Sequence, residues 1–220
     1  MMRRITLLLC VLGAIASPVA AQTSDRIGIF GVGQFGYMRF AAEKSFDAIL
    51  GTTGGSFGGG GAEFRVGNVF LNASIDRFKK TGQRVVVEDG EVFHLGIPDT
   101  VTVIPVAVSA GWRFTSEHAT PYIGGGVGRM FYNEQTRLPE KASCGCRTSN
   151  PGELLDTVDA RFATYHALAG IEFRNEWAAT AFEVQYTRAP RTIGVGGASA
   201  AFQETNLGGL TGRIRILFGH

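Results

Sequence analysis

The segment Leu210-Thr211-Gly212-Arg213-Ile214-Arg215-Ile216-Leu217-Phe218 decides the fold, because its side chains alternate in character. Leucine, glycine, isoleucine and phenylalanine at the even positions alternate with Thr211, Arg213 and Arg215. Successive side chains of a β-strand point to opposite faces, so this strand has one apolar face and one charged face. The pattern predicts a strand that separates an apolar environment from a polar interior.

The same period of two recurs along the chain, and we find no convincing amphipathic helix. Phe162–Phe173 and Trp177–Tyr186 show it most clearly, whereas both faces of the first segment are apolar or glycine, which leaves its orientation open. Each segment is long enough for the ~9–11 residues with which a tilted strand crosses a bilayer. The expected strands are Arg26–Phe40, Gly55–Val66, Val69–Lys79, Thr100–Phe114, Pro121–Asn133, Arg161–Arg174, Trp177–Arg188 and Asn206–Phe218.

The connections between these segments alternate in length. Short turns are expected at 66–68, 116–120 and 175–176, and long loops at 41–54, 80–99, 134–160 and 189–205. Short turns at one end and long loops at the other are typical of an up-and-down outer-membrane barrel with an even number of strands. The fold class predicted is all-β: an eight-stranded antiparallel up-and-down transmembrane β-barrel.

The beginning of the chain has the features of a signal peptide. Arg3 and Arg4 precede the apolar run Ile5–Ala16, and small residues precede the expected cleavage after Ala21. We therefore expect residues 1–21 to be a signal peptide and residues 22–220 to be the barrel domain. Without the two arginines the basic and acidic residues number 19 each, so the remaining chain has no electrostatic signature of nucleic-acid binding.

Three features together resemble the small outer-membrane β-barrel family, which includes OmpA-transmembrane, OmpX and OmpW-like proteins. They are Val19-Ala20-Ala21 at the cleavage site, Pro121-Tyr122-Ile123-Gly124-Gly125-Gly126-Val127-Gly128, and the alternating C-terminal strand. The resemblance implies a protein of the Gram-negative cell outer membrane, in contact with lipopolysaccharide and phospholipid and monomeric. The chain departs from the family where Gly219 and His220 follow Phe218, since the family's last strand usually ends in an aromatic residue.

Aromatic residues beside the strand ends are interpreted as an interfacial girdle on the lipid face. They are Phe64, Trp112, Phe114, Tyr122, Phe173, Tyr186 and Phe218. Charged residues on the opposite face are expected to form a paired network in the lumen, because an eight-stranded barrel is just filled by its side chains and unpaired buried charges are costly. The predicted lumen set is Glu63, Arg65, Asp76, Arg113, Arg129, His166, Glu172, Glu183, Arg213 and Arg215, in which Glu183 pairs with Arg213 or Arg215.

Catalytic and metal-binding motifs are not recognisable in this sequence. The PagL-type lipid A deacylases place His and Ser two residues apart on one strand, but Leu168 stands two residues after His166. The four histidines have no ligand spacing, so we expect no metal, no cofactor and no enzyme activity. Cys144 and Cys146 lie in the third long loop, and we interpret them as a local disulfide, with a metal site as the less favoured alternative.

The second long loop contains a hairpin signal. Asp89-Gly90 separates two Val- and Phe-containing runs and favours a type I′ turn, so the flanking strands are expected to continue as a ribbon. Loops 80–99 and 134–160 are then the expected contacts for an extracellular surface or ligand. The leading functional hypothesis is a non-enzymatic envelope barrel; the alternatives are a narrow porin-like channel for small or hydrophobic solutes, a lipid A-modifying enzyme, and a secreted lipocalin-type barrel.

Overall fold

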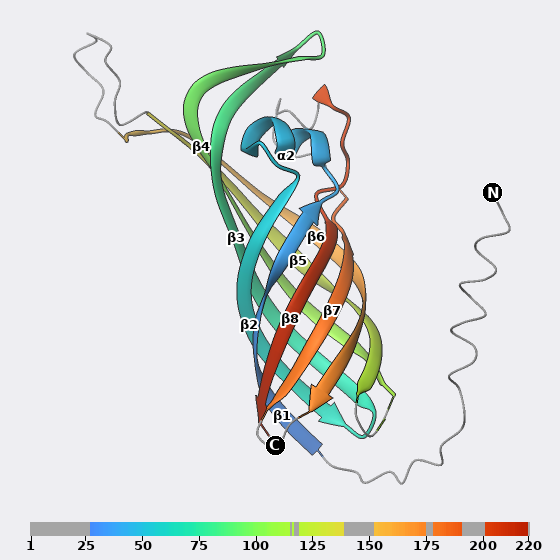
Figure 1. The fold of residues 1–220 in the computed structure, drawn as a ribbon. Helices are drawn as coiled ribbons and strands as arrows, with labels where there is room; N and C mark the ends of the chain where they lie inside the picture. Colours follow the sequence, from blue (N-terminus) through green and yellow to red (C-terminus); the bar gives the residue numbers. More distant parts are fainter. Residues whose placement is uncertain are drawn as a thin grey trace, which may run out of the picture.

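Eight antiparallel strands close into a barrel in the order β1 to β8, with β8 hydrogen-bonded back to β1 (Figure 1). The computed structural model describes residues 27–114, 116, 119–138, 152–174, 178–190 and 201–219. The fold class predicted from the sequence is confirmed. The elements are β1 Ile27–Phe40, α2 Glu43–Leu50, β2 Gly54–Val66, β3 Val69–Glu88, β4 Glu91–Arg113, β5 Thr120–Arg137, β6 Leu154–Arg174, β7 Ala179–Arg188 and β8 Gly209–Gly219.

The four middle strands extend beyond the barrel; the ribbon predicted for β3 and β4 is confirmed, whereas the extension of β5 and β6 was not expected. β3 and β4 extend to a two-residue turn at Asp89 and Gly90, whose φ angles of 51° and 84° suit a type I′ turn. β5 and β6 likewise extend into the expected loop 134–160, where Glu134 pairs with Val158. In Figure 1 this extension rises beyond the end of the barrel that carries the long connections, which we call the long-loop end.

The side chains of the barrel wall separate by character, as the alternation predicts. Outward positions carry exposed apolar residues such as Ile29, Val127 and Phe182, and inward positions carry the charged and polar residues. β1, whose orientation the sequence left open, turns Phe30 and Gln34 inward.

Two aromatic assignments need correction. Tyr122 is buried inside the barrel rather than in the lipid girdle, because the missing side chain of its partner Gly170 on β6 leaves room for its ring. Tyr186 faces outward as expected, but it lies two residues before the long-loop end of β7, whereas Phe64, Trp112 and Phe173 lie near the short turns.

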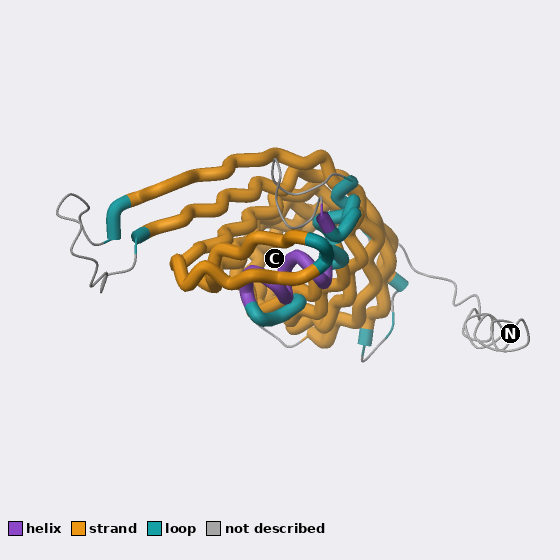
Figure 2. The backbone as a smooth tube through the Cα atoms, turned by 90° about the horizontal axis from the view of Figure 1, so that it is seen from above, coloured by secondary structure: helices purple, strands orange, loops and turns teal. Residues whose placement is uncertain are grey.

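The connection 41–53 contains a helix that the sequence analysis missed. α2 turns Phe46 and Leu50 into the long-loop end of the barrel, and it ends at Gly51, which has a left-handed φ of 65°. Figure 2, seen along the barrel, shows this helix lying within the ring of strands. Among the described residues, no helix combines the length and apolar character needed to cross a membrane.

Gly36 lies at the seam where the last strand meets the first, at a position where a side chain would not fit. A Cβ atom built on Gly36 would be 2.1 Å from the Gly212 carbonyl oxygen and 2.8 Å from the Arg213 Cα. Gly33, on the same strand, faces outward and has nothing within 4 Å of such a Cβ atom. The close approach of β1 and β8 therefore depends on the missing side chain at position 36.

We expect Gly36→Ala to lower the free energy of unfolding by roughly 1–3 kcal/mol, the usual cost of overpacking. Urea unfolding of the protein in detergent micelles measures this difference. Gly33→Ala is the matched control and should unfold at the wild-type urea concentration; equal stability of the two variants would contradict a tight seam.

Candidate functional site

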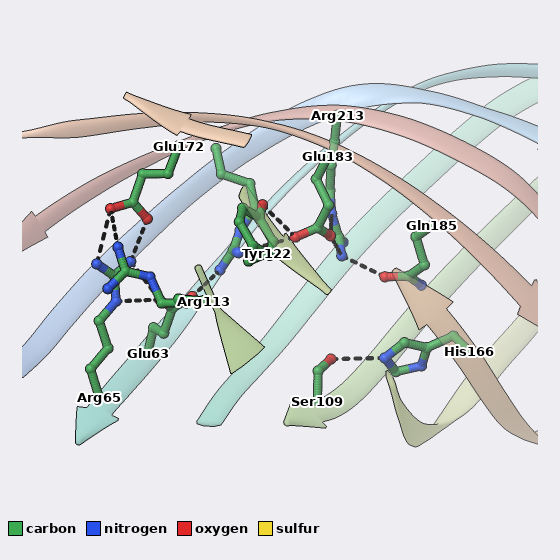
Figure 3. Close-up of polar contacts among 11 residues, drawn as sticks. Glu63, Arg65, Ser109, Arg113, Tyr122, His166, Glu172, Glu183, Gln185 and Arg213 are labelled. Carbon is green, nitrogen blue, oxygen red and sulfur yellow. Dashed lines mark hydrogen bonds and ion pairs between the residues drawn. The ribbon is translucent and has the colours of Figure 1, made fainter. Parts of the chain in front are cut away.

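A chain of ion pairs begins near the short-turn end of the lumen. Arg65 on β2 donates to both carboxylate oxygens of Glu172 on β6, at 3.0 and 2.6 Å. Its Nε also donates to Oε1 of Glu63, at 2.6 Å, and Arg113 on β4 donates to Glu172 at 2.8 Å. One carboxylate therefore holds two guanidinium groups from two different strands (Figure 3).

The series of ion pairs continues toward the long-loop end through two arginines of β8. Arg215 donates to Glu63 at 2.8 Å and to Glu183 on β7 at 3.1 Å. Arg213 donates to Oε1 of Glu183 through its Nε, at 2.7 Å, and its Nη1 lies 3.5 Å from Oδ2 of Asp76 on β3. β8 thus connects the ion pairs near the short-turn end with those farther along the lumen.

The eight charges alternate in sign along this path. The order is Arg113, Glu172, Arg65, Glu63, Arg215, Glu183, Arg213 and Asp76, and each neighbouring pair is within 4.0 Å. Seven of the eight side chains are at most 7% exposed, and Arg113 is 13% exposed. We call this set the ionic chain; its four arginines and four carboxylates balance in charge, as burial of ions requires.

The structure brings nine of the ten predicted lumen residues inside the barrel. Eight form the ionic chain, and His166 lies apart from them. Arg129 was assigned to the lumen wrongly: it is exposed on the outer face of β5. The inward row of β5 places Gly124, Gly126 and Gly128 in line with Tyr122 and Met130, and a row of glycines gives no alternation from which the register can be deduced.

Uncharged side chains support the ionic chain, and the sequence analysis missed them. Gln34 donates to Asp76 at 2.6 Å, and Tyr122 donates to Glu183 at 2.9 Å. Gln185 accepts from Arg213 at 2.5 Å, and the Phe30 ring lies 4.2 Å from the Arg65 guanidinium carbon. Gln185 lies two residues after Glu183 on the inward face of β7, and Gln34 is the polar residue of the inward row of β1; these positions were the available signal.

His166 is hydrogen-bonded to a serine from another strand rather than to a catalytic partner on its own. Its Nε2 lies 2.8 Å from Oγ of Ser109, and both side chains are buried in the lumen. Within the described residues, no carboxylate is hydrogen-bonded to this imidazole, and Leu168 is buried beside it. A Ser–His–acid triad needs the third group to orient the base, so this pair has the geometry of a buried polar contact.

Metal ligation has no candidate in the part of the chain that the structure describes. No group of three or more His, Cys, Asp or Glu side chains there has the geometry to hold a metal ion. Cys144 and Cys146, for which we predicted a disulfide, lie outside the described residues, as does the expected signal peptide 1–21.

An apolar cluster closes the lumen at the long-loop end. Phe40 stacks on Phe46 of α2 with ring centroids 3.8 Å apart and meets Phe78 edge-on at 5.1 Å. Met130 and Phe162 complete the layer from the facing strands. We call this set, which also includes Met38, Leu50, Phe57, Val101, Val103, Tyr132 and Leu207, the apolar cap.

A glutamate from the β7–β8 connection holds α2 over the apolar cap. The Glu204 carboxylate accepts from the backbone N–H groups of Lys44 and Ser45, both at 2.9 Å, and from the Ser45 hydroxyl. These groups belong to the first turn of α2, where backbone N–H groups lack partners within the helix and a negative charge is stabilising. The helix is therefore fixed at both ends of the 41–53 connection, by Glu204 and by the Gly51 turn.

A buried carboxyl lies at the base of the extension beyond the barrel. Asp99 on β4 is 1% exposed and accepts from the Thr136 hydroxyl at 3.4 Å; the same hydroxyl accepts from Arg84 at 3.0 Å. Burial, together with the neighbouring Glu134, raises the pKa of Asp99 to about 7 from its ordinary 3.8. Glu134 in turn accepts from the Tyr132 hydroxyl at 2.6 Å.

Comparison with known proteins finds similarity at the level of fold. No family model matches the sequence, and no curated protein matches it. The N-terminal β-barrel domain of Pseudomonas aeruginosa OprF has a TM-score of 0.42 at 11% identity, covering 87% of this chain and 97% of that one. Neisserial surface protein A gives 0.44 at 11%, covering 86% and 96%. Ail, the attachment invasion locus protein of Yersinia pestis, gives 0.46 at 11%, covering 88% and 98%, in a complex with the heparin analogue sucrose octasulfate.

The apolar outer wall and the charged lumen together indicate the environment in which this barrel is stable. An apolar exterior around a closed ring of strands, with ions paired inside, is the arrangement of an outer-membrane barrel. The fold is that of an eight-stranded outer-membrane β-barrel, as the sequence predicted.

We expect Glu183→Ala to reduce the free energy of unfolding by about 3–5 kcal/mol, because it leaves Arg213 and Arg215 buried without their shared carboxylate. Heat-dependent gel mobility of the folded protein in detergent, measured over a temperature series, gives the shift in midpoint. Glu43→Ala is the matched control: Glu43 forms an exposed pair with Arg39 at 2.9 Å, and such pairs contribute less than about 1 kcal/mol. Equal midpoints for the two variants would contradict the role of Glu183.

Because folding raises the pKa of Asp99, we expect the protein to lose stability as pH rises. The pKa of this carboxyl is raised on folding from 3.8 to about 7, so the folded state binds the proton more tightly and stability falls between these two values. Asp99→Asn should be more stable than the wild type at pH 8 and should differ less from it at pH 4. Urea unfolding in detergent at both pH values measures this, and a wild type that gains on the variant as pH rises would refute it.

Proposed function

We propose that this protein is a non-enzymatic structural barrel of the cell envelope, closed to solutes, that presents the extension of β3–β6 outside the membrane. The observation that carries the proposal is the ionic chain, in which each of the four lumen arginines contacts at least one lumen carboxylate. A selective pore needs charges of one sign facing water, whereas these charges face one another. We also propose that residues 1–21 are removed on export.

The apolar cap provides a second barrier in series with the ionic chain. Phe40, Phe78 and Met130 are each at most 1% exposed, so little water reaches the layer beneath α2. A solute would have to displace both this layer and the paired ions below it. These two barriers favour the structural hypothesis over the narrow channel.

The outer part of the extension has the features of a contact surface. Val86, Phe93 and Leu95 are 46–47% exposed on the ribbon, although they lie beyond the barrel. Its base is braced by Arg84, which forms an ion pair with Asp156 on β6 at 3.1 Å. Exposed apolar groups on a braced sheet are typical of protein contact sites, so we propose that the ribbon contacts an extracellular surface or ligand.

Recordings in planar bilayers test the closed lumen. We expect no conductance steps from the wild-type protein over a wide range of voltage, with insertion verified by the faster migration of the unboiled protein on a denaturing gel. The double variant Phe40→Ala/Glu183→Ala weakens both barriers and is expected to produce measurable current. Regular conductance steps from the wild type would reject the proposal in favour of a channel.

Shortening the ribbon tests its role separately. Replacing residues 84–95 by a two-residue Asn-Gly turn should leave the unfolding midpoint of the barrel within a few degrees of the wild type, because the ionic chain and apolar cap lie outside the deleted stretch. Binding of bacteria that display the protein to host-cell layers should fall, with Glu43→Ala as the surface control. Undiminished binding by the shortened protein would remove the ribbon from the proposal.

A further inference from the structure

On several strands the outward side chains share a pattern. Starting from the short-turn end, they are uncharged until the first charged residue, which is an arginine. On β3 the run Val69, Leu71, Ala73 and Ile75 stops at Arg77, and on β7 the run Thr180, Phe182, Val184 and Tyr186 stops at Arg188. On β5 the run from Ile123 through Val127 stops at Arg129. The residue that was misassigned to the lumen therefore belongs to a pattern on the outer wall.

These arginines lie at similar depth. Arg77, Arg129 and Arg188 follow the first residues of their strands, Val69, Thr120 and Ala179, by eight, nine and nine positions. A tilted strand climbs about 2.5 Å per residue, so they lie roughly 20–23 Å from the short-turn end, near the far boundary of an apolar band about 25 Å tall. That boundary is where the phosphate groups of outer-leaflet lipids are found.

The densest part of this pattern spans β3 to β6. Val106 pairs with Arg129, and Ile104 pairs with Phe131, which in turn pairs with Arg161. Arg129 and Arg161 are thus diagonal neighbours on adjacent strands, about 7–8 Å apart at the backbone. The Arg161 guanidinium carbon lies 5.7 Å from the centre of the Phe131 ring, and Arg77 and Lys79 continue the positive surface on β3.

The carboxylate nearest to Arg161 along β6 is hydrogen-bonded to a neutral amide. Asp159, two residues before Arg161 on β6, accepts from Asn133 at 2.7 Å. On the other side of the barrel, Arg39 is paired with Glu43. The four cations Arg77, Lys79, Arg129 and Arg161 form no ion pair among the described residues within 4.0 Å, so a positive surface is held at headgroup depth above an apolar wall.

We propose that Arg129, Phe131 and Arg161, with Arg77 and Lys79 beside them, form a binding site for the phosphate groups of an anionic glycolipid of the outer leaflet. The acyl chains of that lipid lie against Val106, Val108 and Val127 on the same strands. Guanidinium groups bind phosphate through paired N–H donors, and the apolar wall below selects a lipid over a free phosphate ion. The proposed lipid site is independent of the functional proposals above. It requires neither a closed lumen nor a ribbon that contacts an extracellular surface.

Native mass spectrometry of the full chain folded in detergent tests the site directly. Titration with diphosphorylated lipid A is expected to give a bound complex, whereas lipid A stripped of its phosphates should bind at least about tenfold more weakly, as expected for the loss of contacts to two or more cations. Inorganic phosphate at the same concentration should not compete. Equal binding of both forms of lipid A, or full competition by inorganic phosphate, would overturn the proposal.

Variants locate the site on the wall. Arg129→Gln/Arg161→Gln should reduce binding of diphosphorylated lipid A by about tenfold or more, and Arg129→Lys/Arg161→Lys should restore part of it. Arg174→Gln is the control, because Arg174 is an exposed cation on the same strand as Arg161 but lies at the short-turn end, over the ring of the lumen residue Phe30. A loss as large in the Arg174 variant as in the double variant would place the interaction elsewhere and reject the site.

Discussion

Every part of this molecule is constrained by the need to keep buried charge paired. The barrel is narrow and its outer wall is apolar, so guanidinium and carboxylate groups inside it depend on one another and on a few polar side chains, such as Gln34 and Tyr122, as partners. The ionic chain meets this condition by alternating sign from Arg113 to Asp76. Its members come from β2, β3, β4, β6, β7 and β8, while β1 and β5 contribute Gln34 and Tyr122. The network thus connects every strand across the lumen as well as around the wall.

The two halves of the barrel interior are filled by different kinds of side chain. The ionic chain fills the half near the short turns, where the strands end abruptly and the interior is polar. The long-loop end is filled by the apolar cap, which α2 covers and Glu204 holds in place. Between the cap and the ribbon, Asp99, Glu134 and Arg84 lie where the sheet leaves the membrane. Polarity therefore changes twice along the axis, from paired ions to aromatic rings and back to charge.

Sequence periodicity was sufficient for the fold and for most of the lumen, since nine of the ten assigned residues lie inside. It gave wrong assignments where successive side chains do not differ in polarity. The glycine row of β5 concealed the register, which misplaced both Arg129 and Tyr122. The helix was missed because eight residues give little periodic signal, although Phe46, Ile49 and Leu50 before Gly51 have helical spacing. The pairing of Glu183 with Arg213 and Arg215 on the adjacent strand was deduced and is confirmed. Distant partners could not be deduced, because residues such as Arg65 and Glu172 are 107 positions apart and meet only through the closed ring.

The contribution of the last strand to the ionic chain has a consequence for biogenesis. β8 supplies Arg213 and Arg215, half of the arginines in that chain, and it is the last strand in chain order. An insertion intermediate that lacks it carries four lumen carboxylates against two cations, a surplus of two negative charges in a space without counterions. Burial of that surplus is costly, so the open sheet is disfavoured in the bilayer until zippering of the final segment neutralises it. Charge balance in the lumen therefore requires the last strand to be in place.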